Sequence, residues 1–181
     1  CITDARVKVE AKRVPAPALV QDLISFSFNT RTPLPQVIDA RAPHFSQWAA
    51  ELETVAARYE AKKRAANALD YDDLLRFWLT LLAEHPDIAT RLGRQFCHIL
   101  VDEYQDTNIV QSEIVERLAS HNGRNLMVVG DDAQSIYQFR GANYDNILSF
   151  GERNPGTEIF KLEVNYRSTP EILDFTNASI A

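Results

Sequence analysis

Two short apolar runs, each followed by acidic residues, constrain the fold more than any other feature of the sequence. Residues 96–101 lead into Asp102 and Glu103, and residues 125–129 lead into a glycine and two further aspartates. The segment between them, about 108–121, has the pattern of a helix. Strand, helix and strand in this order predict an α/β fold with a parallel sheet, at whose carboxyl edge both acidic groups would lie.

The remaining segments extend this pattern in both directions. Before residue 69 the apolar spacing predicts helices on either side of a loop at residues 31–35, which contain two prolines. Asp70 has the position of an N-cap for a helix that continues to Pro86. A third strand is expected over residues 157–164, and residues 168–171 have the spacing of a capping box that opens a last helix.

Composition excludes several classes of protein. The chain has 181 residues, 45% of them hydrophobic, which is ordinary for a globular protein. No apolar run approaches the roughly 18 residues of a membrane span, and the first residues lack the layout of a signal peptide, so we expect a cytoplasmic protein. Two cysteines make neither a disulfide framework nor a metal pattern.

The net charge of −6 is unevenly distributed. Residues 1–68 carry +3 and residues 69–181 carry −9. Acidic clusters of this kind can bind cations as readily as they repel phosphates. The basic residues 62–64 have two interpretations, of which a solvated helix end is favoured over contact with a phosphate backbone. Trp48 and Tyr59 are expected to pack in a core.

An apolar strand that ends in Asp-Glu is typical of a Walker B site. There the first carboxylate, here Asp102, holds Mg²⁺ through its water shell, and the second, Glu103, polarises the attacking water. The pattern is weak by itself, because N-caps and surface turns also place acids after apolar runs. Its continuation is more specific.

Three longer segments carry a family resemblance. Residues 101–108 read Val-Asp-Glu-Tyr-Gln-Asp-Thr-Asn, residues 129–142 read Val-Gly-Asp-Asp-Ala-Gln-Ser-Ile-Tyr-Gln-Phe-Arg-Gly-Ala, and residues 162–168 read Leu-Glu-Val-Asn-Tyr-Arg-Ser. In order and spacing they resemble the extended Walker B motif, motif III and motif IV of superfamily 1 DNA helicases of the UvrD/Rep/PcrA type. Residues 69–75 resemble a fourth, shorter element of that family.

The resemblance implies roles for individual residues. Gln134 would sense the γ-phosphate of ATP, Tyr166 would stack on the adenine, and Arg167 would act as an arginine finger. Tyr137, Phe139 and Arg140 would contact single-stranded DNA through stacking and phosphate pairing. Without the resemblance, a pair of aromatic residues such as Tyr137 and Phe139 is more often found in a core.

The sequence also departs from the family pattern. Phe139 stands where many relatives have Trp, and Val164 replaces a common Gln. No Gly-x-x-x-x-Gly-Lys-Ser/Thr phosphate loop occurs in the 181 residues. We therefore expect the sequence to be an internal part of a longer protein, and the chain alone not to hydrolyse ATP.

The sequence thus predicts part of a RecA-like parallel sheet of the P-loop NTPase type with an inserted helical subdomain. Residues 1–68 would form that subdomain, residues 69–160 the C-terminal part of the first motor domain, and residues 161–181 the start of the second. The resemblance implies an ATP- and Mg²⁺-dependent DNA helicase that translocates 3′ to 5′ on single-stranded DNA and duplex junctions in repair, replication or recombination, with no membrane partner. A helicase fused to a nuclease and a non-catalytic interaction module remain alternatives.

Overall fold

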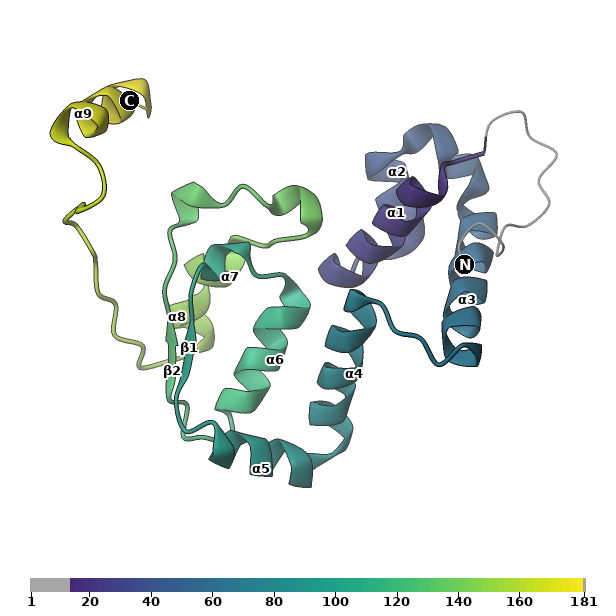
Figure 1. Ribbon diagram of the computed structural model, residues 1–181, viewed down its shortest axis with the longest axis horizontal. Coiled ribbons are helices and arrows are strands. Elements are labelled where there is room, and N and C mark those ends of the chain that lie inside the picture. Colours follow the sequence, from purple (N-terminus) through teal and green to yellow (C-terminus); the bar gives the residue numbers. More distant parts are fainter. Residues whose placement is uncertain (1–13, 181) are drawn as a thin grey trace. The chain divides into compact units, whose positions relative to one another are not determined.

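The computed structural model describes residues 14–180, except for the side chains of Arg140 and Ile180. The chain divides into two compact units, residues 1–150 and residues 151–181. Within the first unit, helices predominate and a small parallel sheet lies among them (Figure 1). The fold is therefore mixed α/β, as predicted, although most of its elements are helical. No helix among residues 14–180 is long and apolar enough to cross a membrane.

The N-terminal helices pack around one apolar core. They are α1 (Pro17–Thr30), α2 (Leu34–Arg41), a 3₁₀ turn (Pro43–Trp48) and α3 (Ala49–Ala65). Val37 and Ile38 of α2 are at most 1% exposed and lie at the centre of this core, against which Trp48 and Tyr59 also pack. The core positions predicted for those two aromatic residues are confirmed.

Helix α2 is absent from the sequence-based prediction, which assigned residues 31–35 to a loop. The chain leaves α1 at Arg31, whose backbone is left-handed with φ 54°, and α2 begins only three residues later. Pro35 stands in the first turn of α2, where its missing N–H would have no partner in a helix anyway. Prolines that suggested a loop therefore mark the start of a helix.

A second group of helices packs together beside the sheet: α4 (Tyr71–Glu84), α5 (Pro86–Gln95) and α6 (Ile109–Ala119). Asp70 caps α4 as predicted, because its side chain accepts from the Asp73 N–H and the Asp73 carboxylate accepts in return from the Asp70 N–H. Asn108 forms the same reciprocal box with Gln111 at the start of α6. These caps fix where both helices begin.

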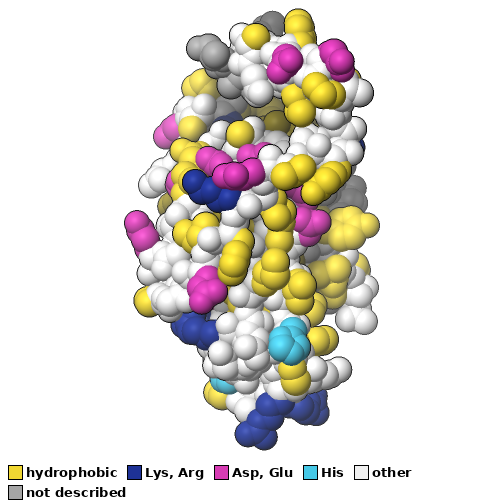
Figure 2. Space-filling model, turned by 90° about the vertical axis from the view of Figure 1, so that its left-hand side faces the viewer, with side chains coloured by type: hydrophobic (Ala, Val, Ile, Leu, Met, Phe, Trp, Pro, Cys, Tyr) yellow, Lys and Arg dark blue, Asp and Glu magenta, His cyan; other side chains and the backbone are white. Residues whose placement is uncertain are grey.

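The sheet consists of two parallel strands, β1 (Ile99–Val101) and β2 (Leu126–Val128), with α6 as the connection between them. Both predicted strands are confirmed, although they are shorter than expected. Ile99 packs against the apolar cluster that includes residues of α6, whereas Leu100 and its partner Met127 are 72% and 56% exposed. Within residues 14–150, only one face of the sheet is thus covered. The view in Figure 2 shows exposed hydrophobic side chains among acidic ones at the surface of the chain.

The third strand predicted over residues 157–164 is wrong. These residues form no regular element, and Ile159, Phe160 and Leu162 are each at least 80% exposed. A strand needs a neighbouring strand for its backbone hydrogen bonds, and within residues 14–180 no strand pairs with this segment. The second unit continues into α9 (Pro170–Ile180). This helix begins within residues 168–171, where its start was predicted.

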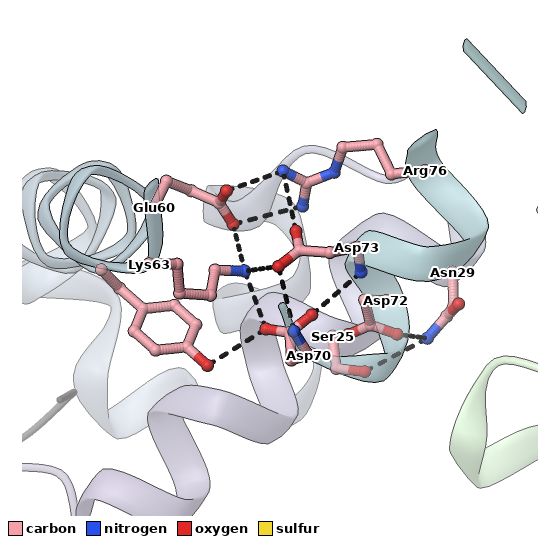
Figure 3. Close-up of polar contacts among 9 residues, drawn as sticks. Ser25, Asn29, Glu60, Lys63, Asp70, Asp72, Asp73 and Arg76 are labelled. Carbon is pink, nitrogen blue, oxygen red and sulfur yellow. Dashed lines mark hydrogen bonds and ion pairs between the residues drawn. The ribbon is translucent and has the colours of Figure 1, made fainter. Parts of the chain in front are cut away.

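Lys63 on α3 is buried in an ionic network with α4 (Figure 3). Its Nζ lies 2.9 Å from a carboxylate oxygen of Glu60 and 2.7 Å from oxygens of Asp70 and Asp73. Arg76 pairs with Glu60 at 2.8 Å and closes the network. The preferred interpretation of residues 62–64 as a solvated helix end is therefore wrong for Lys63, which is 7% exposed and joins two helices instead.

The network shifts the acid–base properties of its members. Burial is the largest single effect and by itself would lower the pKa of Lys63 and raise those of the carboxyls, but the hydrogen bonds and nearby opposite charges together outweigh it. Hydrogen bonds to Asp70, Asp73 and Glu60 raise the pKa of Lys63 above its ordinary value. Hydrogen bonds from Arg76 and Lys63 lower the pKa of the Glu60 carboxyl. Hydrogen bonds from Lys63 and Tyr59 lower the pKa of the Asp70 carboxyl. Lys63, Glu60 and Asp70 are consequently charged at neutral pH.

Candidate functional site

The end of β1 delivers Asp102 and Glu103 to the surface, and both side chains are exposed. Glu103 has a left-handed backbone, with φ 50° and ψ 43°, which is unusual for a residue that carries a Cβ. The Asp102 Oδ1 accepts a hydrogen bond of 2.9 Å from the Glu103 N–H and so supports this turn. Backbone strain of this kind is found preferentially at functional sites.

The end of β2 forms a matching turn beside it. After Gly130, the Asp131 carboxylate accepts from the Ala133 N–H at 3.0 Å and from Nε2 of Gln134 at 2.7 Å. This contact holds the Gln134 side chain against Asp131 in the 3₁₀ turn Asp132–Gln134. The exposed amide of Gln134 thus lies on the same sheet edge as Asp102 and Glu103, the two carboxylates that follow β1.

Gln105 connects the two turns. It is 1% exposed, its Nε2 donates to Oε2 of Glu103 at 2.7 Å, and its Oε1 accepts from the Asp131 N–H at 3.1 Å. Gly130 permits this approach, because a Cβ there would lie only 2.4 Å from the Gln105 Oε1. The sequence predicts no role for Gln105, although it lies within the segment that resembles the extended Walker B motif.

Tyr137 and Phe139 follow the second turn and are exposed rather than part of a core, at 40% and 58%. Their ring centroids are 6.1 Å apart, with 37° between the ring planes. Tyr137 also lines a pocket of about 300 Å³ together with Asp106, Asn108, Gln111 and Ala142. Arg140 ends the 3₁₀ turn Gln138–Arg140, and its side chain lies outside the described part of the structure.

Buried amides join α1 to the start of α6, and the residues just before α6 to Asn146, which follows this segment. Nδ2 of Asn108 donates to Oδ1 of Asn29 at 2.8 Å, and Nδ2 of Asn146 donates to the Thr107 carbonyl at 3.0 Å. Gly141, with φ 91°, lies against Asn29, where an added Cβ would be 3.1 Å from the Asn29 Cβ. The loop that carries Tyr137 and Phe139 therefore returns to a rigid, hydrogen-bonded base.

Tyr166 and Arg167 belong to the second unit, residues 151–181. Both side chains are exposed, Tyr166 to 93%. The Asn165 Oδ1 accepts from the backbone N–H groups of Arg167 and Ser168 at 2.8 and 2.9 Å, which shapes the turn before α9. Of the predicted nucleotide-site residues, the structure brings Asp102, Glu103 and Gln134 to one sheet edge, while these two lie in the other unit.

The acidic edge does not form a closed metal cage. No group of three or more His, Cys, Asp or Glu side chains within residues 14–180 is placed to hold a metal ion. An exposed single carboxylate such as Asp102 fits Mg²⁺, which keeps several waters and takes few protein ligands beside a phosphate substrate.

Comparison with known proteins places this arrangement in a family. A family model described as "UvrD/REP helicase N-terminal domain" matches residues 2–155. The chain is 46% identical over 137 residues to the ATP-dependent DNA helicase UvrD1 of Mycobacterium leprae and 45% identical over 136 residues to PcrA of Leuconostoc citreum. It is 37% identical over 163 residues to Rep of Escherichia coli.

These alignments cover most of the chain but a minor part of each relative. They include 71%, 75% and 90% of the chain, against 18%, 18% and 24% of UvrD1, PcrA and Rep respectively. All three relatives are named as ATP-dependent DNA helicases. The chain belongs to the UvrD/REP helicase N-terminal domain family.

Proposed function

We propose that the chain is part of an ATP-dependent helicase that translocates 3′ to 5′ along single-stranded DNA and opens duplexes at their junctions. The observation that carries the proposal is the joined sheet edge, where Gln105 links Glu103 to the turn that holds Gln134. Two carboxylates and an amide at one edge of a parallel sheet supply the polar groups that phosphoryl transfer to water requires.

In this proposal each polar group has a separate task. Asp102 would hold Mg²⁺, which would supply charge neutralisation at the phosphates, and Glu103 would accept a proton from the attacking water. Gln134 contacts the γ-phosphate, Tyr166 stacks on the adenine, and Arg167 stabilises the charge that develops on the transferred phosphoryl group. The fold in this proposal is RecA-like, for which the parallel pair β1–β2 and the crossover helix α6 are the support.

The segments have corresponding positions in the proposed parent protein. We assign residues 1–68, of which 14–68 are described by the structure, to a helical subdomain inserted in the first motor domain, residues 69–160 to that domain, and residues 161–181 to the start of the second. The exposed rings of Tyr137 and Phe139, three and five residues after Gln134, would contact DNA. Because these rings follow Gln134 so closely in the sequence, a movement of Gln134 at the phosphate would be transmitted through one short turn to the residues that contact DNA.

The decisive experiment measures unwinding by the full-length protein that contains these residues. Duplexes with a 3′ or a 5′ single-stranded tail are compared in the presence of ATP and Mg²⁺. We expect strand separation and DNA-stimulated ATP hydrolysis with the 3′ tail, and neither when Mg²⁺ is chelated. Preference for the 5′ tail would refute the polarity, and hydrolysis indifferent to single-stranded DNA would refute the helicase proposal.

Replacing Phe139 by Ala should weaken binding of single-stranded DNA to the full-length protein by about 1–3 kcal/mol, the usual range for loss of one base-stacking ring. The loss should be similar for oligonucleotides of different sequence, because stacking does not depend on base edges. Fluorescence anisotropy at constant salt measures it. Phe77→Ala is the matched control, since Phe77 is 46% exposed on α4, away from motif III. Equal affinities of the two variants would show that Phe139 does not contact DNA.

A further inference from the structure

The orientation of the Gln105 amide is determined by its partners. Asp131 offers a backbone N–H, which only the amide oxygen can accept, and Glu103 offers a carboxylate oxygen, to which only the amide nitrogen can donate. Both ends of the side chain are therefore used, in a position that is 1% exposed. A buried amide satisfied at both ends is held in one rotamer, because any other would leave polar groups unpaired.

The contact constrains the carboxylate that follows β1. The backbone of Glu103 is held by Oδ1 of Asp102, and its Oε2 is held by Gln105. Glu103 as a residue is exposed, so water can reach its side chain. A carboxylate fixed at its backbone and at one oxygen presents the other oxygen in a defined direction.

Other side chains cannot make this connection. Asn is one methylene shorter and cannot span the distance between Glu103 and Asp131. Glu could accept from the Asp131 N–H, but it would place a second carboxylate where Nε2 now lies 2.7 Å from Glu103. Met has a similar length and makes neither hydrogen bond. The position thus requires a donor at one end and an acceptor at the other, which a glutamine provides.

The chain of contacts extends to the second turn. The Asp131 N–H donates to Oε1 of Gln105, and Oδ2 of Asp131 accepts from Nε2 of Gln134. We propose that Gln105 is a positioning residue. It orients the Glu103 carboxylate toward the attacking water and holds it in a fixed position relative to Gln134. This inference rests on the proposed function, in which Glu103 activates water and Gln134 contacts the γ-phosphate.

The test uses the full-length protein with single-stranded DNA at saturation. Gln105→Met should lower kcat for ATP hydrolysis about ten- to a hundredfold, because a displacement of about 1 Å in a catalytic group can have an effect of that size. The dissociation constant of a fluorescent ATP analogue should change less than twofold, since Gln105 itself contacts no nucleotide in this proposal. Gln95→Met, at the exposed end of α5, should leave kcat unchanged.

A second substitution separates positioning from folding. Gln105→Glu retains an acceptor for the Asp131 N–H but removes the donor to Glu103, so its kcat should fall as far as that of Gln105→Met. This variant decides the matter if Gln105→Met fails to fold. A Gln105→Glu protein that binds the analogue normally and hydrolyses ATP at the full rate would overturn the inference.

A double-mutant cycle identifies the partner through which Gln105 acts. In a Glu103→Gln background, Gln105→Met should cause no further loss of kcat, because residues that act as a unit are not additive. Additive losses, or a weakened analogue affinity that accounts for the lower rate, would contradict the positioning role. Full activity of Glu103→Gln alone would instead contradict the proposed function, so the two failures are distinguishable.

Discussion

Glu103→Gln in the full-length protein is expected to lower kcat for ATP hydrolysis by about two to four orders of magnitude, the usual contribution of a general base. The amide has nearly the same shape as the carboxylate, and its oxygen can still accept from Nε2 of Gln105. It cannot take a proton from water, however. Affinity for ATP should therefore stay within about twofold, because the substitution removes an interaction made only in the transition state.

Single-turnover hydrolysis and binding of a fluorescent ATP analogue measure the two quantities separately. Glu53→Gln is the matched control, because Glu53 is exposed on α3 and its substitution removes the same charge at a different place. A Glu103→Gln protein that turns over at the normal rate would remove Glu103 from the proposed mechanism. A parallel loss of rate and ATP affinity would indicate a binding role instead.

Lys63→Met should lower the free energy of unfolding of the chain by about 3–5 kcal/mol, the range for removing one partner of a buried ion pair. Lys63 is 7% exposed and Asp73 is 2% exposed, so the substitution removes the cation that Asp70 contacts and leaves Asp73 only a longer contact, 3.6 Å, with Arg76, in a place that water reaches poorly. The effect should exceed that of an exposed ion pair, which contributes at most about 1 kcal/mol. Urea titration followed by circular dichroism provides the measurement.

Arg64→Met is the neighbouring control, because Arg64 is exposed on the same helix. Its substitution should change the free energy of unfolding by no more than about 0.5 kcal/mol, as is usual for surface positions. If Lys63→Met and Arg64→Met proved equally mild, the network would contribute no more than a surface pair, and α3 and α4 would be held together by their apolar contacts.

Local sequence signals predicted the elements whose determinants are themselves local. Asp70 caps α4 because its side chain and that of Asp73 are three residues apart, a spacing that is visible in the sequence. The two apolar runs became β1 and β2 because each is bounded by polar residues and joined by an amphipathic helix. The motifs that indicated a DNA helicase are also contiguous, and the family comparison supports them.

Elements that depend on distant partners were predicted less well. Residues 157–164 have the composition of a strand, but a strand exists only when another backbone pairs with it, and no described residue does so. Lys63 has the sequence context of a solvated helix end, yet carboxylates seven and ten residues later surround it. Neither outcome can be deduced from a window of local sequence.

The candidate site divides in the same way. Asp102, Glu103 and Gln134 could be singled out because their residue types and motifs indicate phosphate chemistry. That Gln105 joins them depends on parallel pairing of β1 with β2, which brings Asp131 within 3.1 Å of a side chain 26 positions earlier. Room for the contact depends in turn on Gly130, whose missing Cβ is significant only once the two turns are adjacent.

The sequence by itself determined the chemistry available at the sheet edge and the family to which the chain belongs, because side-chain identity and motif order are properties of the chain alone. Only the tertiary structure decided that Gln105 is buried between two acidic turns and that Lys63 bridges two helices. The physical reason is that burial and pairing are set by groups far apart in sequence. An amide or an ammonium acquires its role from the partners that the fold brings within hydrogen-bonding distance.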